Sequence, residues 1–319
     1  MITVRVLNAA RGRAACLAVA AVFMTASLFV SAAASAEQWL LVRPHAGVEI
    51  ESAASAKQIT GLTPQQTFTE NGLTWNIFYD DVNAENGIGF DGPNGAQAQA
   101  RVEDAARYIA RVLNENGTLD VRFEVSQTDA SGFLAAAGSR YFVADGFQDP
   151  ISLIRLQTGS KPASNVAEID ATVDFGFPWN FSDGPPDGGQ FDFISVIVHE
   201  LTHGLGFASL SLPNGQSQFI DAVPPADAFA TYDQFLRRGT SGQQLWGGFP
   251  VAFQGIIADL TSDDLEWTGP GGNAGFAPAA APPIFAPNPY NEGSSISHWD
   301  SAIPGGAVMV PSIAPGFQL

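Results

Sequence analysis

The sequence predicts an α+β fold in which a twisted sheet packs on helices. Short segments of alternating apolar and polar residues, which are typical of strands, occur at 73–79, 121–125 and 173–177. Apolar residues recur at helical spacing in two other segments, 101–113 and 193–203. The order strand, helix, strand, strand, helix favours a sheet with helices packed against it.

Residues 1–36 have the features of a secretory signal peptide. Three arginines precede an apolar run from Ala14 to Val30, and the small-residue motif Ala34-Ser35-Ala36 follows it. A transmembrane anchor is the alternative, because this apolar run is long for a signal peptide. No later stretch is long and apolar enough to cross a bilayer, so we expect a secreted or periplasmic protein.

The composition excludes several classes of function. The only cysteine, Cys16, lies in the predicted signal peptide, which argues against a cysteine protease, a thiolate metal site or a disulfide framework. The formal net charge of −18 argues against nucleic acid or anionic membrane as a partner.

A structural Ca²⁺ site is a further candidate, although a solvated acidic loop is the alternative. The carboxylates considered for it are Asp183, Asp187 and Asp192.

The rest of the chain divides into a lead-in segment and one domain. Residues 37–70 have little periodicity, and we interpret them as a lead-in segment or short propeptide. Residues 71–319 form the domain. Its first helix, 101–113, should stop near Gly117, and its strand at 173–177 has the polar and small neighbours that suit an exposed strand.

The segment 193–203 predicts an amphipathic helix, which Asp187 or Asp192 could cap. From about 209 to 297 the chain is irregular, with one further helix expected near 228–236. The residues expected to bury the apolar stripe of the 193–203 helix are Phe193, Ile197 and Leu201.

This helix carries the residues that point to chemistry. His199 and His203 are four residues apart, so they face the same way at the spacing needed to share one tetrahedral Zn²⁺. Glu200 lies beside them, where it could take a proton from water activated by the metal. The pattern predicts zinc-dependent hydrolysis of a protein or peptide, whereas two surface histidines on a helix are the structural alternative.

A catalytic zinc needs a third protein ligand. Only two histidines remain in the chain, and His45 lies far upstream of the helix, so we select His298. The rival carboxylates are Asp221, Asp227, Asp233, Glu266 and Glu292.

The segment 199–207 resembles the metzincin metalloproteases, whose pattern is H-E-x-x-H-x-x-G-x-x-H. Gly206 matches the glycine at which the backbone turns to end the helix. Ser209 stands where that pattern has its third histidine. This chain instead resembles the leishmanolysin-like peptidases. These have a long insert after Gly-Phe, followed by Ser-His-Trp and then by the methionine of a Met-turn. In this chain the insert is 209–297, and Ser297-His298-Trp299 and Met309 follow.

The resemblance implies a metzincin-like fold with the cleft between an upper and a lower subdomain and a sheet of mostly antiparallel edges over the active-site helix. It implies Zn²⁺ held by His199, His203 and His298, Glu200 as general base, and Met309 beneath the metal. The strand near 173–177 would be the edge that binds extended peptide.

Two other interpretations stay open. The first is an exported binding or adhesion module that keeps zinc as a structural staple. It is disfavoured because Glu200 is present and because a structural zinc prefers four protein ligands. The second is a related zinc enzyme in which Asp233 or Glu266 is the third ligand.

Overall fold

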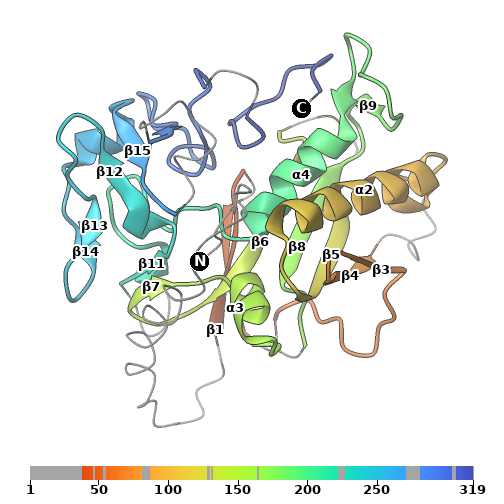
Figure 1. Cartoon of the computed structure of the whole chain (residues 1–319), viewed down its shortest axis with the longest axis horizontal. Helices are drawn as coiled ribbons and strands as arrows, with labels where there is room; N and C mark the ends of the chain where they lie inside the picture. The colour runs from red at the N-terminus through yellow and green to blue at the C-terminus, as the bar shows by residue number, and fades with distance from the viewer. Residues whose placement is uncertain are drawn as a thin grey trace, which may run out of the picture.

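The computed structural model describes residues 38–318, apart from 46, 53–54, 81–86, 128–129, 131, 164, 222–226, 271–280 and 304–306. The predicted signal peptide lies outside these residues. In the described part of the chain, no helix is long and apolar enough to cross a membrane. The architecture is a mixed α+β fold, as predicted, built on a seven-stranded sheet that two long helices cross in Figure 1.

The sheet has the strand order β2-β1-β6-β8-β5-β4-β3. Its centre is parallel, from β8 through β5 to β4, and both of its edges are antiparallel. The strands are β1 (Gln38–Arg43), β2 (Gly47–Ser52), β3 (Gln66–Glu70), β4 (Leu73–Tyr79), β5 (Gly117–Gln127), β6 (Ala135–Phe142) and β8 (Ile169–Asp174).

The first predicted strand and helix are confirmed. The strand at 73–79 is β4, and the helix at 101–113 is the C-terminal part of α2 (Gly95–Leu113). The helix ends because Asn114 adopts the left-handed conformation and its N–H bonds back to Ala110, so Asn114 is the stop and not Gly117, which begins β5. Helix α2 links β4 to β5 as a parallel crossover.

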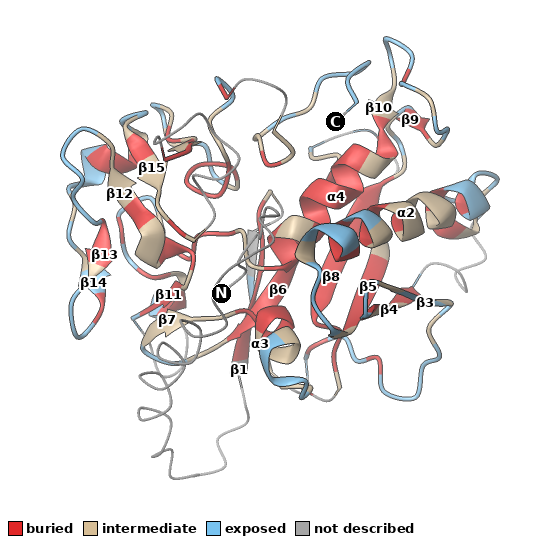
Figure 2. Ribbon diagram, viewed as in Figure 1, coloured by how far each residue is buried: buried red, intermediate tan, exposed pale blue. Residues whose placement is uncertain are grey.

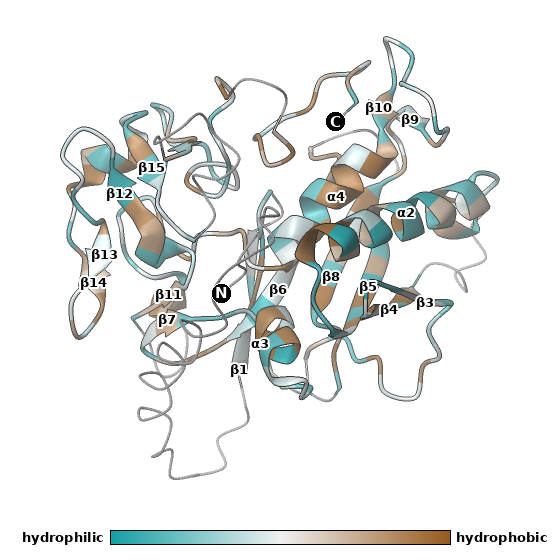
Figure 3. Cartoon of the chain, viewed as in Figure 1, coloured by the Kyte–Doolittle hydropathy of each residue, from teal (hydrophilic) through white to brown (hydrophobic). Residues whose placement is uncertain are grey.

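One face of the sheet forms the main apolar core with α2 and α4 (Phe193–Gly204). Residues of β5 and β8 alternate, so that Val121, Phe123 and Ile169 are buried against these helices. Figure 2 shows the strands and α4 as largely buried, whereas the outer side of α2 is exposed. In Figure 3 the hydrophobic colour follows α4, and α2 is hydrophilic on that outer side. The sheet therefore positions α4 through apolar burial.

The prediction of an exposed edge strand at 173–177 is wrong: only Val173 and Asp174 belong to a strand, β8, and residues 175–177 form a turn. The sheet face opposite the apolar core buries charge. Strand β8 is paired on both sides, by β5 and β6, and all of its residues are buried. Its Asp170 pairs with Arg122 and Arg140, and Arg140 also pairs with Glu51 of β2. Polar residues in a strand suggest solvent exposure, but the buried Asp170 is satisfied by its two arginine partners.

The segment interpreted as a lead-in is part of the sheet. Residues 38–52 form the β1–β2 hairpin, which pairs with β6, and residues 66–70 form β3. In β1 the run Trp39–Val42 is apolar and buried on both faces, which removes the alternation by which a strand is recognised. That the segment is removed as a propeptide stays a prediction.

The insert folds into a second, β-rich lobe with its own apolar cluster beside β1 and β6. The predicted helix near 228–236 is wrong: this segment forms the short strand β11 (Ala228–Ala230), a single 3₁₀ turn at Asp233–Phe235 and the start of β12 (Leu236–Arg238). Strand β11 pairs with β7 (Gly146–Gln148). The other strands of the lobe are β13 (Trp246–Gly247), β14 (Ala252–Phe253), β15 (Leu265–Trp267) and β16 (Pro283–Ile284).

A short helix, a two-stranded pair and three 3₁₀ turns complete the description. Helix α3 (Ile151–Thr158) contacts β5 and β6, and its Ser152 hydroxyl donates to the Gly204 carbonyl at the end of α4. The short parallel pair before α4 consists of β9 (Trp179–Asn180) and β10 (Phe191–Asp192). The remaining 3₁₀ turns are Gly89–Asp91, Gln218–Asp221 and Ile257–Thr261.

Candidate metal centre

Helix α4 is built as the sequence predicts. Asp192 is its N-cap, and the carboxylate accepts hydrogen bonds from the backbone N–H and the hydroxyl of Ser195. The apolar stripe is fully buried in the core against the sheet and α2. With this face buried, the opposite face turns His199, Glu200 and His203 toward the insert. The members of the stripe are Phe193, Ile197 and Leu201.

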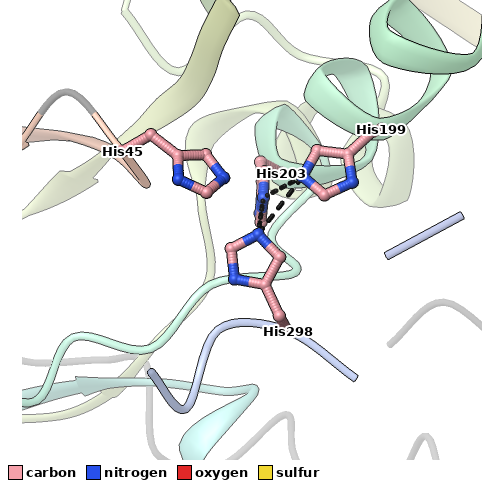
Figure 4. Close-up of side chains that lie close together, drawn as sticks. All are labelled: His45, His199, His203 and His298. Carbon is pink, nitrogen blue, oxygen red and sulfur yellow. Dashed lines mark hydrogen bonds between the residues drawn. The ribbon is translucent and has the colours of Figure 1, made fainter. Parts of the chain in front are cut away.

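Three imidazoles converge on one point. The Nε2 atoms of His199 and His203 are 3.0 Å apart, those of His203 and His298 are 3.1 Å apart, and those of His298 and His199 are 3.2 Å apart. Figure 4 shows these three rings pointing toward one another. In a tetrahedral zinc site with bonds of about 2.0 Å, two ligand nitrogens lie about 3.3 Å apart. The predicted set of three histidines therefore has the spacing of a metal site.

The hydrogen bonds of the Nδ1 atoms explain why a cation fits between the three Nε2 atoms. The Nδ1 atoms of His199, His203 and His298 lie 2.6–2.7 Å from the backbone carbonyls of Val308, Phe207 and Ser294, respectively. A carbonyl can only accept, so each Nδ1 carries the proton and each neutral ring presents an Nε2 lone pair. Three lone pairs that face each other at this distance repel unless a positive ion lies between them.

Burial keeps these rings neutral. It lowers the pKa of His199 to about 4 and lowers the pKa of His203 and His298 well below the usual histidine value. Neutral imidazole is the form that binds a metal. The cluster can therefore hold a metal ion without first releasing protons near neutral pH.

Gly206 lets the chain leave α4 in the required direction. Its φ is +101°, and a Cβ atom there would lie 2.8 Å from the ring of Pro150. The turn places the Phe207 carbonyl where it accepts from His203 Nδ1. The glycine of the motif thus fixes the orientation of one candidate ligand.

The insert returns His298 to α4 through backbone pairing. The N–H of Phe285 donates to the His298 carbonyl, and the N–H of Ile296 donates to the Phe285 carbonyl. The hydroxyl of Ser297 accepts from the N–H of Ser209. Ser209 stands where the metzincin pattern has its third histidine, and here it holds the segment that carries His298.

His45 also lies in the cluster, and the sequence analysis did not select it. Its imidazole projects from the β1–β2 turn beside the other three in Figure 4, with its ring centroid 4.7 Å from that of His298. One candidate ligand atom from each of the four histidines lies within 4.8 Å of the others. The available signal was the count: the chain has four histidines, and the fold brings all of them together.

Glu200 is buried beside this cluster. Its carboxylate accepts a hydrogen bond of 2.7 Å from the N–H of Ala137 in β6. Burial raises the pKa of the Glu200 carboxyl well above its usual value, and the Ala137 N–H opposes this shift. A buried carboxyl with a perturbed pKa beside a possible metal site is a candidate for proton transfer.

A cavity of about 640 Å³ opens next to Glu200 and His199. Its walls come mainly from the start of β6 and the residues before it, from α4, and from the C-terminal segment around 308–314, and Phe177, Phe191 and His45 also line it. Apolar side chains predominate in its lining, which includes Phe133, Leu134, Phe177, Val196, Val308 and Ile313. A cavity of this size can accommodate several residues of an extended peptide.

The rival ligands do not join the cluster. Asp233 accepts from the N–H groups of Leu210 and Ala230, and Glu266 pairs with Arg237. Asp227 and Glu292 are exposed, and the side chain of Asp221 lies outside the described residues. Among the described residues, the histidines form the one group of metal-ligating side chains close enough to hold an ion.

The carboxylates considered for Ca²⁺ are separated in their roles. Asp183 is exposed and pairs with Arg101, whereas Asp192 caps α4. Asp187 is exposed, and its backbone N–H bonds to the side chain of Gln190. Nothing in the described residues therefore supports a calcium site there.

Met309 is buried, and its carbonyl accepts from the N–H of Trp299. The preceding carbonyl, that of Val308, accepts from His199. The segment around Met309 therefore connects the histidines of α4 and the insert through its backbone.

Comparisons of the chain with protein-family models, curated proteins and solved structures found no match.

Proposed function

We propose that the protein is an exported zinc-dependent endopeptidase. The observation that carries the proposal is the triangle of three Nε2 atoms beside a buried glutamate at the wall of a peptide-sized cavity. Imidazole suits zinc among several metals, and three histidines leave one coordination position open for chemistry.

A zinc ion held by His199, His203 and His298 would polarise the substrate carbonyl and lower the pKa of a bound water. Glu200 would act as general base, taking a proton from the attacking water and passing it to the leaving amine. The Ala137 N–H orients the Glu200 carboxylate, and the apolar cavity wall limits competing solvent.

The edge that receives the peptide would belong to β6, because β8 is internal. On the side away from β8, β1 pairs only with residues 139–142 of β6. In the part of the chain that the structure describes, no strand pairs with Ala135–Ala137 on that side, and Ala135 lines the cavity. An extended substrate could add there by strand pairing and bring its scissile carbonyl past Glu200.

The motif order from His199 to Met309 supports assignment to the metzincins, in a leishmanolysin-like branch, as part of the same proposal. The convergence of His298 with His199 and His203 is what that assignment requires of the insert. The predicted signal peptide supports export.

His45 favours a second candidate function, that of a module held together by a structural zinc. Structural zinc sites use four protein ligands, and this cluster offers four. The endopeptidase is preferred because such a staple needs neither Glu200, buried within reach of a cavity, nor an open strand edge beside it.

The deciding experiment measures bound zinc and hydrolysis of an unstructured protein for the wild-type chain and Glu200→Gln. The amide can still accept from Ala137 N–H, so one zinc per chain should remain while hydrolysis falls by about 10²–10⁴-fold. Hydrolysis that persists in Glu200→Gln would refute the mechanism. Zinc binding without any hydrolysis, also in the His45 variants described below, would favour the structural module.

A further inference from the structure

His45 reaches the metal cluster from a part of the chain that is remote from the zinc-binding motif. It lies in the turn between β1 and β2, and its backbone N–H donates to the Gly293 carbonyl. Gly293 is required at this contact, since a Cβ atom there would lie 2.8 Å from the His45 Cα. The approach is therefore specific: two chain segments about 250 positions apart meet in order to place this imidazole.

The hairpin turns where the edge of β6 becomes open. Val42 pairs with Ser139, and continuing β1 in the same direction would carry it along Ala135–Ala137. Instead the chain turns back after Arg43, and His45 at the tip lines the cavity. The tip thus lies between the covered part of the edge and the part proposed to receive substrate.

His45 is held differently from the other three histidines. Their Nδ1 atoms donate to backbone carbonyls at 2.6–2.7 Å, which fixes their rings. The Nδ1 of His45 lies 3.3 Å from the hydroxyl of Ser294, a group that can donate or accept and so fixes neither the tautomer nor the ring.

Two further observations set His45 apart from the other three histidines. His45 has a φ of +73°, a left-handed conformation that is strained for histidine. The three Nε2 atoms lie 3.0–3.2 Å apart, so the 4.8 Å span of the four-histidine group must involve His45. That span exceeds the tetrahedral edge of about 3.3 Å by about 1.5 Å, so His45 would have to move closer to the other three imidazoles to bind the same ion. By contrast, Trp39–Val42 are buried, which keeps the strand itself in place.

We propose that His45 is a displaceable fourth ligand that closes the metal site at rest and gives way when a peptide occupies the open edge of β6. This inference rests on the proposed function, because only a site that performs chemistry needs its fourth position released. The weakly held imidazole supplies the movement, and the anchored backbone of the turn returns it when the peptide leaves.

The test substitutes Co²⁺ for zinc and follows its visible absorption spectrum against pH in the full chain. Four imidazoles leave no ionisable solvent ligand, so the wild-type spectrum should stay constant between about pH 6 and 8.5. In His45→Asn, solvent enters the fourth position, and the spectrum should titrate near neutral pH. Asparagine is chosen because it tolerates the left-handed backbone, and His45→Gly is the second variant should His45→Asn fail to fold.

Peptide hydrolysis gives an independent readout. Since activity scales with the fraction of open sites, kcat/KM should rise at least about tenfold in His45→Asn. A wild-type spectrum that titrates as the variant does would overturn the proposal, and so would a loss of hydrolysis in both His45 variants with cobalt retained. The double variant His45→Asn/Glu200→Gln separates the two proposals, because activity that does not depend on Glu200 refutes Glu200 as the general base while the spectrum still decides the closure.

Discussion

Helix α4 and the insert 209–297 hold opposite sides of the histidine cluster, and they do so by different physics. Helix α4 is regular, and its position follows from an apolar stripe buried against the sheet and α2. The insert has only short strands around its own apolar cluster, and single buried polar groups fix how its segments meet. The Asp233 carboxylate accepts from the N–H groups of Leu210 and Ala230, and the Ser297 hydroxyl accepts from Ser209.

The difference shows what each kind of placement requires. A stripe repeated every three to four residues distributes its stabilisation over many contacts, so the sequence reveals it. A buried carboxylate that satisfies two backbone N–H groups acts at a single point and leaves no periodic trace. Ligands on α4 are therefore recognisable locally, whereas His298 depends on contacts between distant segments.

The largest expected effect tests the apolar stripe. Leu201 is fully buried, so Leu201→Ala should lower the free energy of unfolding of the metal-free chain by about 2–5 kcal/mol. Thr202→Ala, one position along the same helix and only partly buried, should cost far less. Chemical denaturation measures both. Equal losses would show that the stripe does not position α4.

The next effect compares the two sources of ligands. His203→Ala removes a ligand of α4, and His298→Ala removes the ligand supplied by the insert. Both should weaken zinc binding by at least about 100-fold, beyond the loss typical of residues that only orient ligands. Competition with a chelator measures the affinity, and exposed Asp227→Ala is the control. If the zinc affinity of His298→Ala stays within tenfold of the wild-type value, His298 is not a zinc ligand.

The smallest expected effect is a pH dependence in the insert. Burial raises the pKa of Asp233 to about 7, although its hydrogen bonds from Leu210 and Ala230 oppose the shift. Between the ordinary aspartate pKa and this value the folded chain binds more protons than the unfolded chain, so stability from this group is full below about pH 4 and falls as pH rises through 7. The contribution should be about 2 kcal/mol larger at pH 5.5 than at pH 7.5.

Asp233→Asn should remove this contribution to the pH dependence. Unfolding of the metal-free chain at the two pH values measures it, with Asp227→Asn as the matched substitution at an exposed position of the insert. An unchanged difference in Asp233→Asn would mean that the buried carboxyl does not shape the stability of this lobe.

Elements with a local signal were predictable. Alternation located β4, and helical spacing located α4, whose N-cap Asp192 was one of the two candidates. Prediction failed where burial or pairing is decided by distant residues. Strand β8 looked exposed because Asp174 is polar, but it is central and fully buried. Strand β1 looked irregular because both of its faces are buried. Neither fact is present in the segment itself.

By itself, the sequence determined the pair His199 and His203 with Glu200 between them, because the geometry of a helix turns a spacing of four residues into a shared face. The motif order also pointed to His298. Only the tertiary structure decided that His298 arrives and that His45 arrives with it, since β6 pairs with β1 and the β1–β2 turn meets the insert at Gly293. A metal site requires several side chains to point at one position in space. Spacing along the chain determines the directions of side chains only within one regular element.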